Sequence, residues 1–316
     1  MIDIQRHILY SKSPELFMKE RWLAFDVFET KAIKTIKPFE YQLEFIRNIH
    51  NINNNIVVKS RQMHVSSMMA LYIAWYVIFN QEKSVFILSE SSDSSRRILD
   101  QIRIILQDYS VNGVFHWQDD FITNNRTELV LKNGCRIKAA APSIDAGRGW
   151  APDFCYIDEA AFIKNFEQIY AGFGMSMSAR KNTKFVLAST PYDNSLFNKL
   201  FLNAGGDSFF NPIRLHWSIH PVYSIGITED RVRESPFQYS SPWFREMCNR
   251  LRESTNKIEQ ELECVVRYKD ETNKIKTISL RVDSDFYKSI QNRLQPGESI
   301  SDYIRSLIEK DLRYYL

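Results

Sequence analysis

Two adjacent carboxylates, Asp158 and Glu159, follow directly after an apolar run at residues 154–157. Such a run is typical of a strand buried between helices in a parallel sheet, and the carboxyl ends of parallel strands are where ligands bind. There the first acid can hold a hydrated Mg²⁺ ion beside phosphates, and the second can orient or deprotonate an attacking water. The same pattern also arises when a strand simply ends before a helix that begins with a negative charge. The rest of the chain must decide between these interpretations.

A second candidate element is the polar loop at residues 59–66, called here the phosphate loop, which precedes an apolar helix predicted over residues 68–79. A strand, a polar loop and a helix form a phosphate cradle, because backbone N–H groups and the helix N-terminus attract anions. The usual pattern is Gly-x-x-x-x-Gly-Lys-Ser/Thr. The sequence here is Lys-Ser-Arg-Gln-Met-His-Val-Ser. If Ser66 takes the Mg²⁺-binding hydroxyl position, Val65 and His64 stand where Lys and Gly are usual.

Two interpretations of this loop are open. In the first, Lys59 swings over the phosphates and supplies the missing cation, Arg61 assists, and Ser60 and Gln62 belong to the nucleotide-binding loop. In the second, nucleotide chemistry is weak or absent, because His64 carries a Cβ where glycine would adopt a left-handed conformation freely. We favour the first, since both acids at the end of the later strand are present. The plain alternative for the lysine is a solvated charge at a strand end.

The remaining pattern predicts an α/β fold of the P-loop NTPase type, a parallel sheet flanked by helices, because short apolar strands alternate with amphipathic or apolar helices. Residues 133–134 (Asn-Gly) predict a hairpin between two strands, and residues 1–37 are expected to be mostly helical. Polar residues follow three strand ends: the phosphate loop, the acid pair, and Ser189-Thr190. The predicted strands are 56–58, 85–88, 127–130, 136–139, 154–158 and 184–191, and the predicted helices after residue 38 are 41–49, 68–79 and 94–106.

Composition describes an ordinary globular protein of 316 residues, 44% hydrophobic and 25% charged. The formal charge of +3 is mild, so a nucleic-acid surface would have to be a local patch. Four widely spaced cysteines without a histidine cluster argue against a zinc site and fit a reducing compartment. The N-terminus lacks a signal-peptide pattern and no apolar run reaches membrane-spanning length, so no membrane partner is expected.

Several segments, taken in order, resemble the ATPase domain of the large terminase subunit, the DNA-packaging motor of tailed phages. Their order and spacing carry the resemblance more than any single motif, and it covers roughly residues 38–266. The matching segments are an adenine-reading motif (39–42), a divergent phosphate loop (59–66), a second strand-helix unit (84–90 onward), an Arg-Gly loop (145–149), the acid-bearing strand (156–160), a coupling motif (188–191) and two closing segments (243–244 and 259–264).

The resemblance implies ATP and Mg²⁺ as cofactors and a role for each matched residue. Tyr41 would stack on adenine and Gln42 would read its edge, although both also fit an ordinary helix start. Arg148 resembles an arginine finger, which stabilises charge on the transferred phosphoryl group and can come from a neighbouring subunit; a flexible surface loop is its alternative. Ser189 and Thr190 would sense the γ-phosphate and relay its state to DNA.

In the resulting mechanism Lys59 and Arg61 contact phosphates, Ser66 and Asp158 hold Mg²⁺, and Glu159 activates water. The resemblance also implies double-stranded DNA as substrate and a homo-oligomeric ring on a portal. A small terminase subunit and a separate nuclease are further expected partners, in the host cytoplasm. The expected domains are an N-terminal helical segment (1–37), the ATPase core (38–225), a lid or linker (226–272) and a C-terminal module (273–316).

The last fifty or so residues depart from the family, whose large subunits continue into a nuclease with metal-binding aspartates. Residues 276–282 alternate apolar and polar like a half-exposed strand, and two short helices are predicted after it, over 285–294 and 299–313. This strand-helix-helix pattern resembles a ribbon-helix-helix module, which pairs with a second copy and inserts a two-stranded ribbon into the major groove. Thr277, Ser279 and Arg281 would then face the bases. A small cap on the ATPase domain is the alternative.

The leading hypothesis is therefore a packaging-motor ATPase of terminase type, with no nuclease expected from this chain. One rival is a catalytically weak or dead terminase-like scaffold that acts as a DNA-binding regulator or assembly factor. Another is a helicase-like protein, which would share the glutamine motif and the Ser-Thr turn. The missing second RecA-like domain argues against a helicase, because about fifty residues cannot form one.

Overall fold

The computed structural model describes residues 2–25, 33–35, 37–111, 113–116, 119–146, 151–178, 183–229, 237–252 and 254–268. The chain divides into two compact units, residues 1–268 and 269–316. The predicted ribbon-helix-helix module, with Thr277, Ser279 and Arg281, lies outside the described residues and stays a prediction, as does the boundary at residue 273. Within the described part, no helix is long and apolar enough to cross a membrane.

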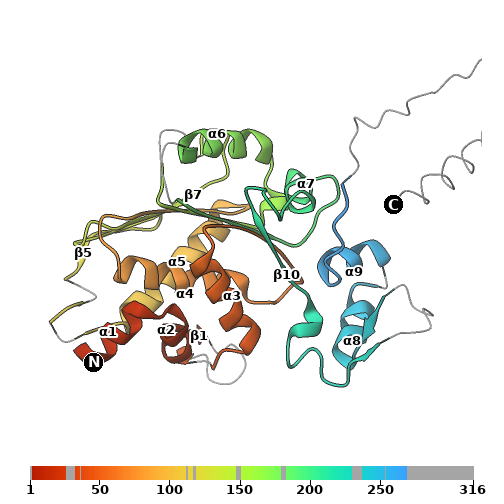
Figure 1. Ribbon diagram of the computed structural model, residues 1–316, viewed down its shortest axis with the longest axis horizontal. Coiled ribbons are helices and arrows are strands. Elements are labelled where there is room, and N and C mark those ends of the chain that lie inside the picture. The colour runs from red at the N-terminus through yellow and green to blue at the C-terminus, as the bar shows by residue number, and fades with distance from the viewer. Residues whose placement is uncertain are drawn as a thin grey trace, which may run out of the picture. The chain divides into compact units, whose positions relative to one another are not determined.

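The centre of the first unit is a mainly parallel sheet (Figure 1), which confirms the predicted α/β class. Its strand order is β10-β3-β9-β8-β4-β7-β6-β5. Strands β10 to β7 pair in parallel, whereas β7-β6 and β6-β5 pair antiparallel. The predicted Asn-Gly hairpin at residues 133–134 connects β6 to β7. The strand bounds are β3 (Asn54–Lys59), β4 (Ser84–Leu88), β5 (Phe121–Asn124), β6 (Glu128–Leu131), β7 (Arg136–Ala140), β8 (Phe154–Asp158), β9 (Lys184–Ser189) and β10 (Asn211–Leu215).

Helices cover the two faces of the sheet, as the buried strands require. One face carries α3 (Glu40–Asn51), α4 (Val65–Ile78) and α5 (Ser92–Asp108), and the other carries α6 (Phe166–Ser178) and α7 (Leu196–Leu202). Strand side chains alternate between the faces. In β8, Phe154 and Tyr156 join the core below α4, whereas Cys155 and Ile157 join the core with α6 and α7.

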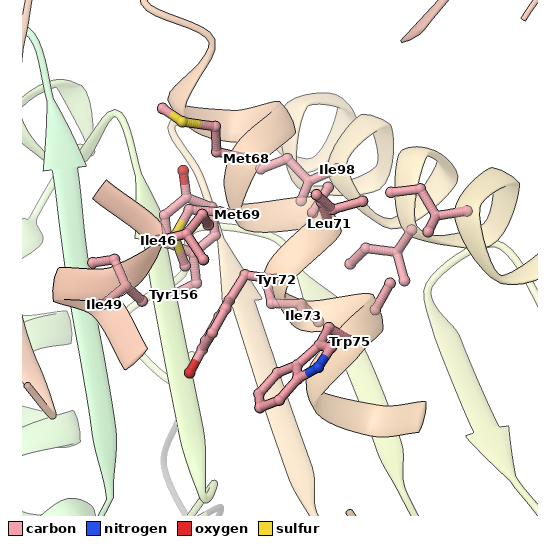
Figure 2. Close-up of a cluster of buried hydrophobic side chains, with 14 of the residues drawn as sticks. Ile46, Ile49, Met68, Met69, Leu71, Tyr72, Ile73, Trp75, Ile98 and Tyr156 are labelled. Atoms are coloured by element: carbon pink, nitrogen blue, oxygen red, sulfur yellow. The ribbon is translucent and has the colours of Figure 1, made fainter. Parts of the chain in front are cut away.

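Helix α4 is apolar on all sides because it lies between the sheet and other helices. Figure 2 shows Met69 and Tyr72 of α4 in one cluster with Ile46 of α3, Ile98 of α5 and Tyr156 of β8. This packing fixes α4, and therefore the phosphate loop that precedes it, relative to the end of β8. The helix begins three residues earlier than the sequence pattern indicated, at Val65.

The N-terminal segment differs from its prediction. Helices α1 (Ile4–Lys12) and α2 (Pro14–Arg21) form as expected, but an antiparallel pair, β1 (Leu23–Phe25) and β2 (Ile33–Thr35), follows them. Tyr10, Phe17 and Trp22 are buried in the same core as α4. Residues 23–25 and 33–35 therefore form strands where the sequence pattern predicted helix, and α1 and α2 pack in the core of the first unit.

A smaller cluster stands beside β10. It is formed by the short 3₁₀ helix η2 (Trp217–Ile219), α8 (Pro242–Arg250) and α9 (Thr255–Glu261), with Trp217, Phe244, Ile258 and Leu262 at its centre. Strands β11 (Thr228–Glu229) and β12 (Tyr239–Ser240) pair antiparallel and precede α8 in the chain. These elements matter for function because their side chains reach the phosphate loop.

Candidate active site

Four parallel strands end side by side and bring separate parts of the sequence together. The register aligns Val58 of β3 with Ser189 of β9, and Ala188 of β9 with Asp158 of β8. It also aligns Leu88 of β4 with Ile157 of β8. Because parallel strands share their carboxyl edge, the phosphate loop, the acid pair, Ser189 and the residues after β4 all lie at this edge.

Lys59 and Glu159 form an ion pair at the strand ends. Lys59 Nζ donates to Glu159 Oε1 at 2.7 Å, and Ser189 Oγ donates to Glu159 Oε2 at 3.4 Å. Burial by itself lowers the pKa of Lys59, but the charges of Glu159 and Asp158 outweigh it and raise the pKa above its ordinary value. Lys59 is therefore a buried ammonium held between two carboxylates, which excludes the solvated strand-end alternative.

Asp158 and Ser66 form the second pair of the site. Ser66 Oγ donates to Asp158 Oδ2 at 2.6 Å, whereas Asp158 Oδ1 is buried and has no hydrogen-bond partner among the residues that the structure describes. Burial raises the pKa of Asp158, and Lys59 and Ser66 offset this only in part. A buried carboxylate oxygen without a partner is costly, so this pair has the chemistry of an oxygen site for a cation.

A cavity of about 460 Å³ opens beside these pairs. Four predicted residues line it, namely Arg61, Ser66, Asp158 and Glu159. The opposite wall includes Glu90 after β4 and Arg97 of α5, neither of which was predicted from the sequence. The serine-rich start of α5 at a strand end was the available signal. Another cavity, of about 350 Å³, lies between α1, the end of α4 and the β6-β7 hairpin, and contains no predicted site residue.

The backbone of the phosphate loop is strained where glycine would relieve it. Gln62 and His64 have φ values of 63° and 59°, in the left-handed region that side chains disfavour. The predicted conflict at His64 is therefore present. Val65, at the usual lysine position, begins α4 and is buried in the core, so it presents no charge to the cavity.

Contacts from the small cluster hold the loop in place. The Arg61 guanidinium pairs with the Glu261 carboxylate, and the Arg61 backbone N–H donates to the Glu261 carbonyl at 2.7 Å. The hydrogen bond between the Arg61 guanidinium and the Glu261 carboxylate raises the pKa of Arg61. Ser60 Oγ donates to the Leu262 carbonyl and accepts the Trp217 N–H at 2.9 Å. Ser60 is buried and does not line the cavity. Its hydroxyl instead links the phosphate loop to residues 217 and 262.

Tyr41 and Gln42 lie beneath the loop and are absent from the cavity wall. Tyr41 Oη donates to the Met63 carbonyl at 3.4 Å, and Gln42 Nε2 donates to Tyr41 Oη at 3.2 Å. Gln42 Oε1 accepts the Phe39 N–H at 2.9 Å, which caps the start of α3. Both side chains are buried. In this arrangement they brace the phosphate loop instead of presenting a free ring and amide to a base.

The remaining predicted site residues are Ser189, Thr190, Gln62 and Arg148. Ser189 Oγ accepts the Ala161 N–H at 3.2 Å, so it links β9 to the turn that follows Glu159. Thr190 is buried, and within the described part of the chain its hydroxyl has no hydrogen-bond partner. The side chain of Gln62 is exposed, and the backbone carbonyl of Gln62 accepts a hydrogen bond from Tyr223 Oη at 3.3 Å. Arg148 lies outside the described residues and stays a prediction.

Comparison with known proteins now decides the family. Residues 56–268 match the family described as "Terminase large subunit, T4likevirus-type, N-terminal". The chain belongs to this family. The match begins in β3 and ends after α9, so it spans the acid pair, the phosphate loop and the segment that carries Glu261. Terminase large subunits belong to phage DNA-packaging motors, and this chain is a terminase large-subunit protein with that family's N-terminal region.

Solved terminase structures share the fold at low sequence identity. The large terminase ATPase domain of Thermus phage P74-26 matches with a TM-score of 0.52 and 16% identity, over 73% of this chain and 94% of that one. The large terminase of bacteriophage HK97 matches with a TM-score of 0.51 and 12% identity, over 66% of this chain and 43% of that one. The large terminase of a thermophilic bacteriophage, in complex with ATP-γ-S, matches with a TM-score of 0.50 and 11% identity, over 73% of this chain and 53% of that one.

Proposed function

We propose that this terminase protein hydrolyses ATP in the cavity beside Asp158 and Glu159 and uses the energy to move double-stranded DNA. The observation that carries the proposal is the paired arrangement at the strand ends, Ser66 with Asp158 and Lys59 with Glu159. A hydroxyl and a carboxylate on one side, and a carboxylate beside a cation on the other, are the groups that phosphoryl transfer requires. The large terminase that was solved in complex with ATP-γ-S supports nucleotide as the ligand class.

Mg²⁺ fits the Ser66–Asp158 pair. Both residues offer oxygen, the ligand type that Mg²⁺ prefers, and Asp158 Oδ1 is buried without a partner. When bound there, the ion would neutralise charge on the phosphate oxygens. Asp158 would hold it in the ionised form, and the Ser66 hydroxyl would turn from donor to ligand.

Glu159 is proposed to orient and deprotonate the attacking water. In the present arrangement its two oxygens accept from Lys59 and Ser189. Hydrolysis therefore requires Lys59 to exchange its carboxylate partner for a phosphate, which frees Glu159 Oε1 for water. Arg61, now paired with Glu261, would make the same kind of exchange. Each exchange replaces one anion by another around a cation, so neither cation is left unpaired.

Several finer roles are also proposed. Arg148 would complete the cavity of a neighbouring subunit in a ring, and Ser189 with Thr190 would relay the state of the terminal phosphate to DNA. Tyr41 and Gln42 would reach adenine only after a rearrangement beneath the phosphate loop, since both are buried now. A portal and a small terminase subunit are the proposed partners in the host cytoplasm.

Residues 273–316 are proposed to bind duplex DNA as a ribbon-helix-helix module. Their alternating strand pattern and the two short helices after it support this role. Deletion of residues 274–316 should weaken duplex binding in a gel-shift titration and reduce dimerisation. Binding that is unchanged by the deletion would remove this part of the proposal.

A second candidate, a weak or inactive scaffold, is favoured by one set of observations. Val65 stands at the lysine position, His64 is strained, and both Lys59 and Arg61 are paired with carboxylates. This candidate would keep the fold and the DNA-binding surface but would turn over little or no ATP.

Steady-state ATP hydrolysis separates the two candidates. The purified protein is assayed with and without linear duplex DNA, beside Glu159→Gln and Lys59→Met. Turnover by the wild type that both substitutions abolish supports the ATPase and the role of Lys59. Equal silence of all three proteins at high concentration and with DNA would leave the scaffold as the function.

A further inference from the structure

One wall of the cavity beside Asp158 and Glu159 has no role in the proposed hydrolysis. It is formed by the residues that follow β4 and by the first three turns of α5, which contribute Glu90, Arg97 and Gln101. Strand β4 pairs with β8 on the side of β8 that faces away from β9 and β3. This wall therefore lies across the acid pair from the phosphate loop.

The packing of α5 determines that Arg97 faces the cavity. Ser91 Oγ accepts the Ser94 N–H at 3.1 Å and starts the helix. Ile98 is buried against α4, as Figure 2 shows, and this anchors the rotation of the helix. Residues three and four apart share a helix face, so Arg97 and Gln101 lie together on the stripe that lines the cavity.

A neutral partner holds the Arg97 side chain. Its Nη2 donates to Ser94 Oγ at 2.6 Å, and Ser94 in turn donates to Glu90. The cations on the other side of the site are paired with carboxylates, Lys59 with Glu159 and Arg61 with Glu261. Among the described residues, Arg97 therefore differs from Lys59 and Arg61, because its hydrogen-bond partner is a hydroxyl instead of a carboxylate. Its charge is available to an anion.

We propose that Arg97 binds the terminal phosphate of ATP within its own subunit and supplies the cation that Val65 does not. The inference rests on the proposed ATP site. A terminal phosphate beside Glu159 would be the phosphate nearest to β4, whereas the inner phosphates would remain on the phosphate loop. A guanidinium fork matches phosphate oxygens in two parallel hydrogen bonds, and the contact needs no second subunit.

The test compares two nucleotides that differ at the terminal phosphate. Calorimetry measures the affinities of ADP and ATP-γ-S, with Mg²⁺, for the full-length wild type, Arg97→Ala, Arg97→Lys and Arg96→Ala. We expect Arg97→Ala to weaken ATP-γ-S about tenfold or more, which is the worth of a charge-assisted hydrogen bond, and to change ADP affinity less than about twofold. Arg97→Lys keeps the positive charge but lacks the two parallel donors of the guanidinium. Its affinity for ATP-γ-S should therefore lie between those of the wild type and Arg97→Ala.

Arg96 is the matched control, because it lies next to Arg97 on α5, pairs with Asp93 and does not line the cavity. Arg97 is exposed, so its substitution should leave the thermal unfolding temperature unchanged. The role of Arg97 is overturned, and the ATP site stands, if the wild type binds both nucleotides and Arg97→Ala either lowers both affinities equally or leaves both unchanged. If the wild type binds neither nucleotide, both the inference and the proposed function are overturned.

Discussion

At the scale of single residues, the site concentrates backbone strain. Gln62, His64 and Glu159 all have positive φ, and all three lie at the carboxyl ends of β3 and β8. Left-handed non-glycine residues cost free energy and persist only where surrounding contacts enforce them. The contact of Tyr223 with the Gln62 carbonyl is one of these. The strain accompanies functional groups, as expected when a loop is shaped for a ligand.

His64→Gly should therefore stabilise the fold. The left-handed conformation costs a Cβ residue about 1–2 kcal/mol, and the extra chain entropy of glycine offsets about 0.5–1 kcal/mol. The free energy of unfolding is expected to rise by about 0.5–1 kcal/mol in a urea titration. His64→Ala keeps the Cβ and should show no gain. A His64→Gly protein less stable than His64→Ala would contradict the strain at this position.

His220 should make stability depend on pH. Burial, aided by nearby His64, lowers the pKa of His220 to about 4. Its Nδ1 accepts the N–H groups of Val222 and Tyr223 at 3.2 and 3.4 Å, which requires an unprotonated nitrogen. Between pH 6.5 and about 4 the unfolded chain binds the proton and the folded chain does not. Stability is then lost as pH falls through this window, by at most about 3 kcal/mol.

Urea unfolding at several pH values between about 7.5 and about 4.5 measures this loss. His220→Asn keeps an acceptor near the same backbone N–H groups but cannot titrate there, so its stability should fall less steeply with acid than that of the wild type. The difference between the two slopes isolates His220 from the other histidines. Parallel curves would show that His220 does not carry the effect.

At the scale of elements, the phosphate loop is held from two sides. Helix α4 is fixed by the core below the sheet, and α9 reaches the loop through Glu261. The first attachment is apolar and extensive, whereas the second is an ion pair plus the Arg61–Glu261 and Ser60–Leu262 hydrogen bonds. A few polar bonds open at lower free energy than a packed core, so α9 is the attachment expected to yield when nucleotide binds.

Glu261→Gln should loosen α9. The substitution keeps the shape but removes the charge that holds Arg61, and we expect a loss of about 1 kcal/mol in stability with faster hydrogen exchange over residues 255–268. Glu246→Gln is the control, because the Glu246–Arg250 pair on α8 is exposed and such pairs contribute little. Exchange in α9 that stays at the wild-type rate would show that the ion pair does not hold the helix.

At the scale of the whole molecule, the proposed function requires the site to work in an assembly of several subunits. The proposed arginine finger, Arg148, would act on the cavity of a neighbour, whereas Arg97 would act within its own subunit. Activity should then depend on contact between subunits, and therefore on protein concentration and on duplex DNA. Each cavity would need an acid pair from one copy and an arginine from another.

Mixed subunits test this dependence. Glu159→Gln and Arg148→Ala should each be inactive alone, because one lacks the water-orienting acid and the other lacks the finger. A mixture of the two should regain a fraction of wild-type turnover, since an intact Glu159 can meet an intact Arg148 at some interfaces. A mixture that stays silent while the wild type is active would contradict action in trans.

Much of the fold and the centre of the site were predictable from local pattern. An apolar strand before Asp158 and Glu159, a polar loop before an apolar helix, and an Asn-Gly hairpin each lie within a few residues of sequence. Local steric and hydrophobic preferences act over that range. The edge strand β10 and the β1-β2 pair escaped prediction, because short strands carry little pattern of their own and form through their neighbours.

The sequence by itself determined the α/β class, the strand ends that carry chemistry, and the likeness to terminases. Only the tertiary structure decided which groups meet there. Lys59 and Glu159 are 100 residues apart, and Arg61 and Glu261 are 200 apart. Burial of Tyr41 and Gln42, and the turn of Arg97 toward the cavity, are likewise results of packing. Strand order and helix rotation set these contacts, and both depend on how the whole core is filled, which no local stretch of sequence encodes.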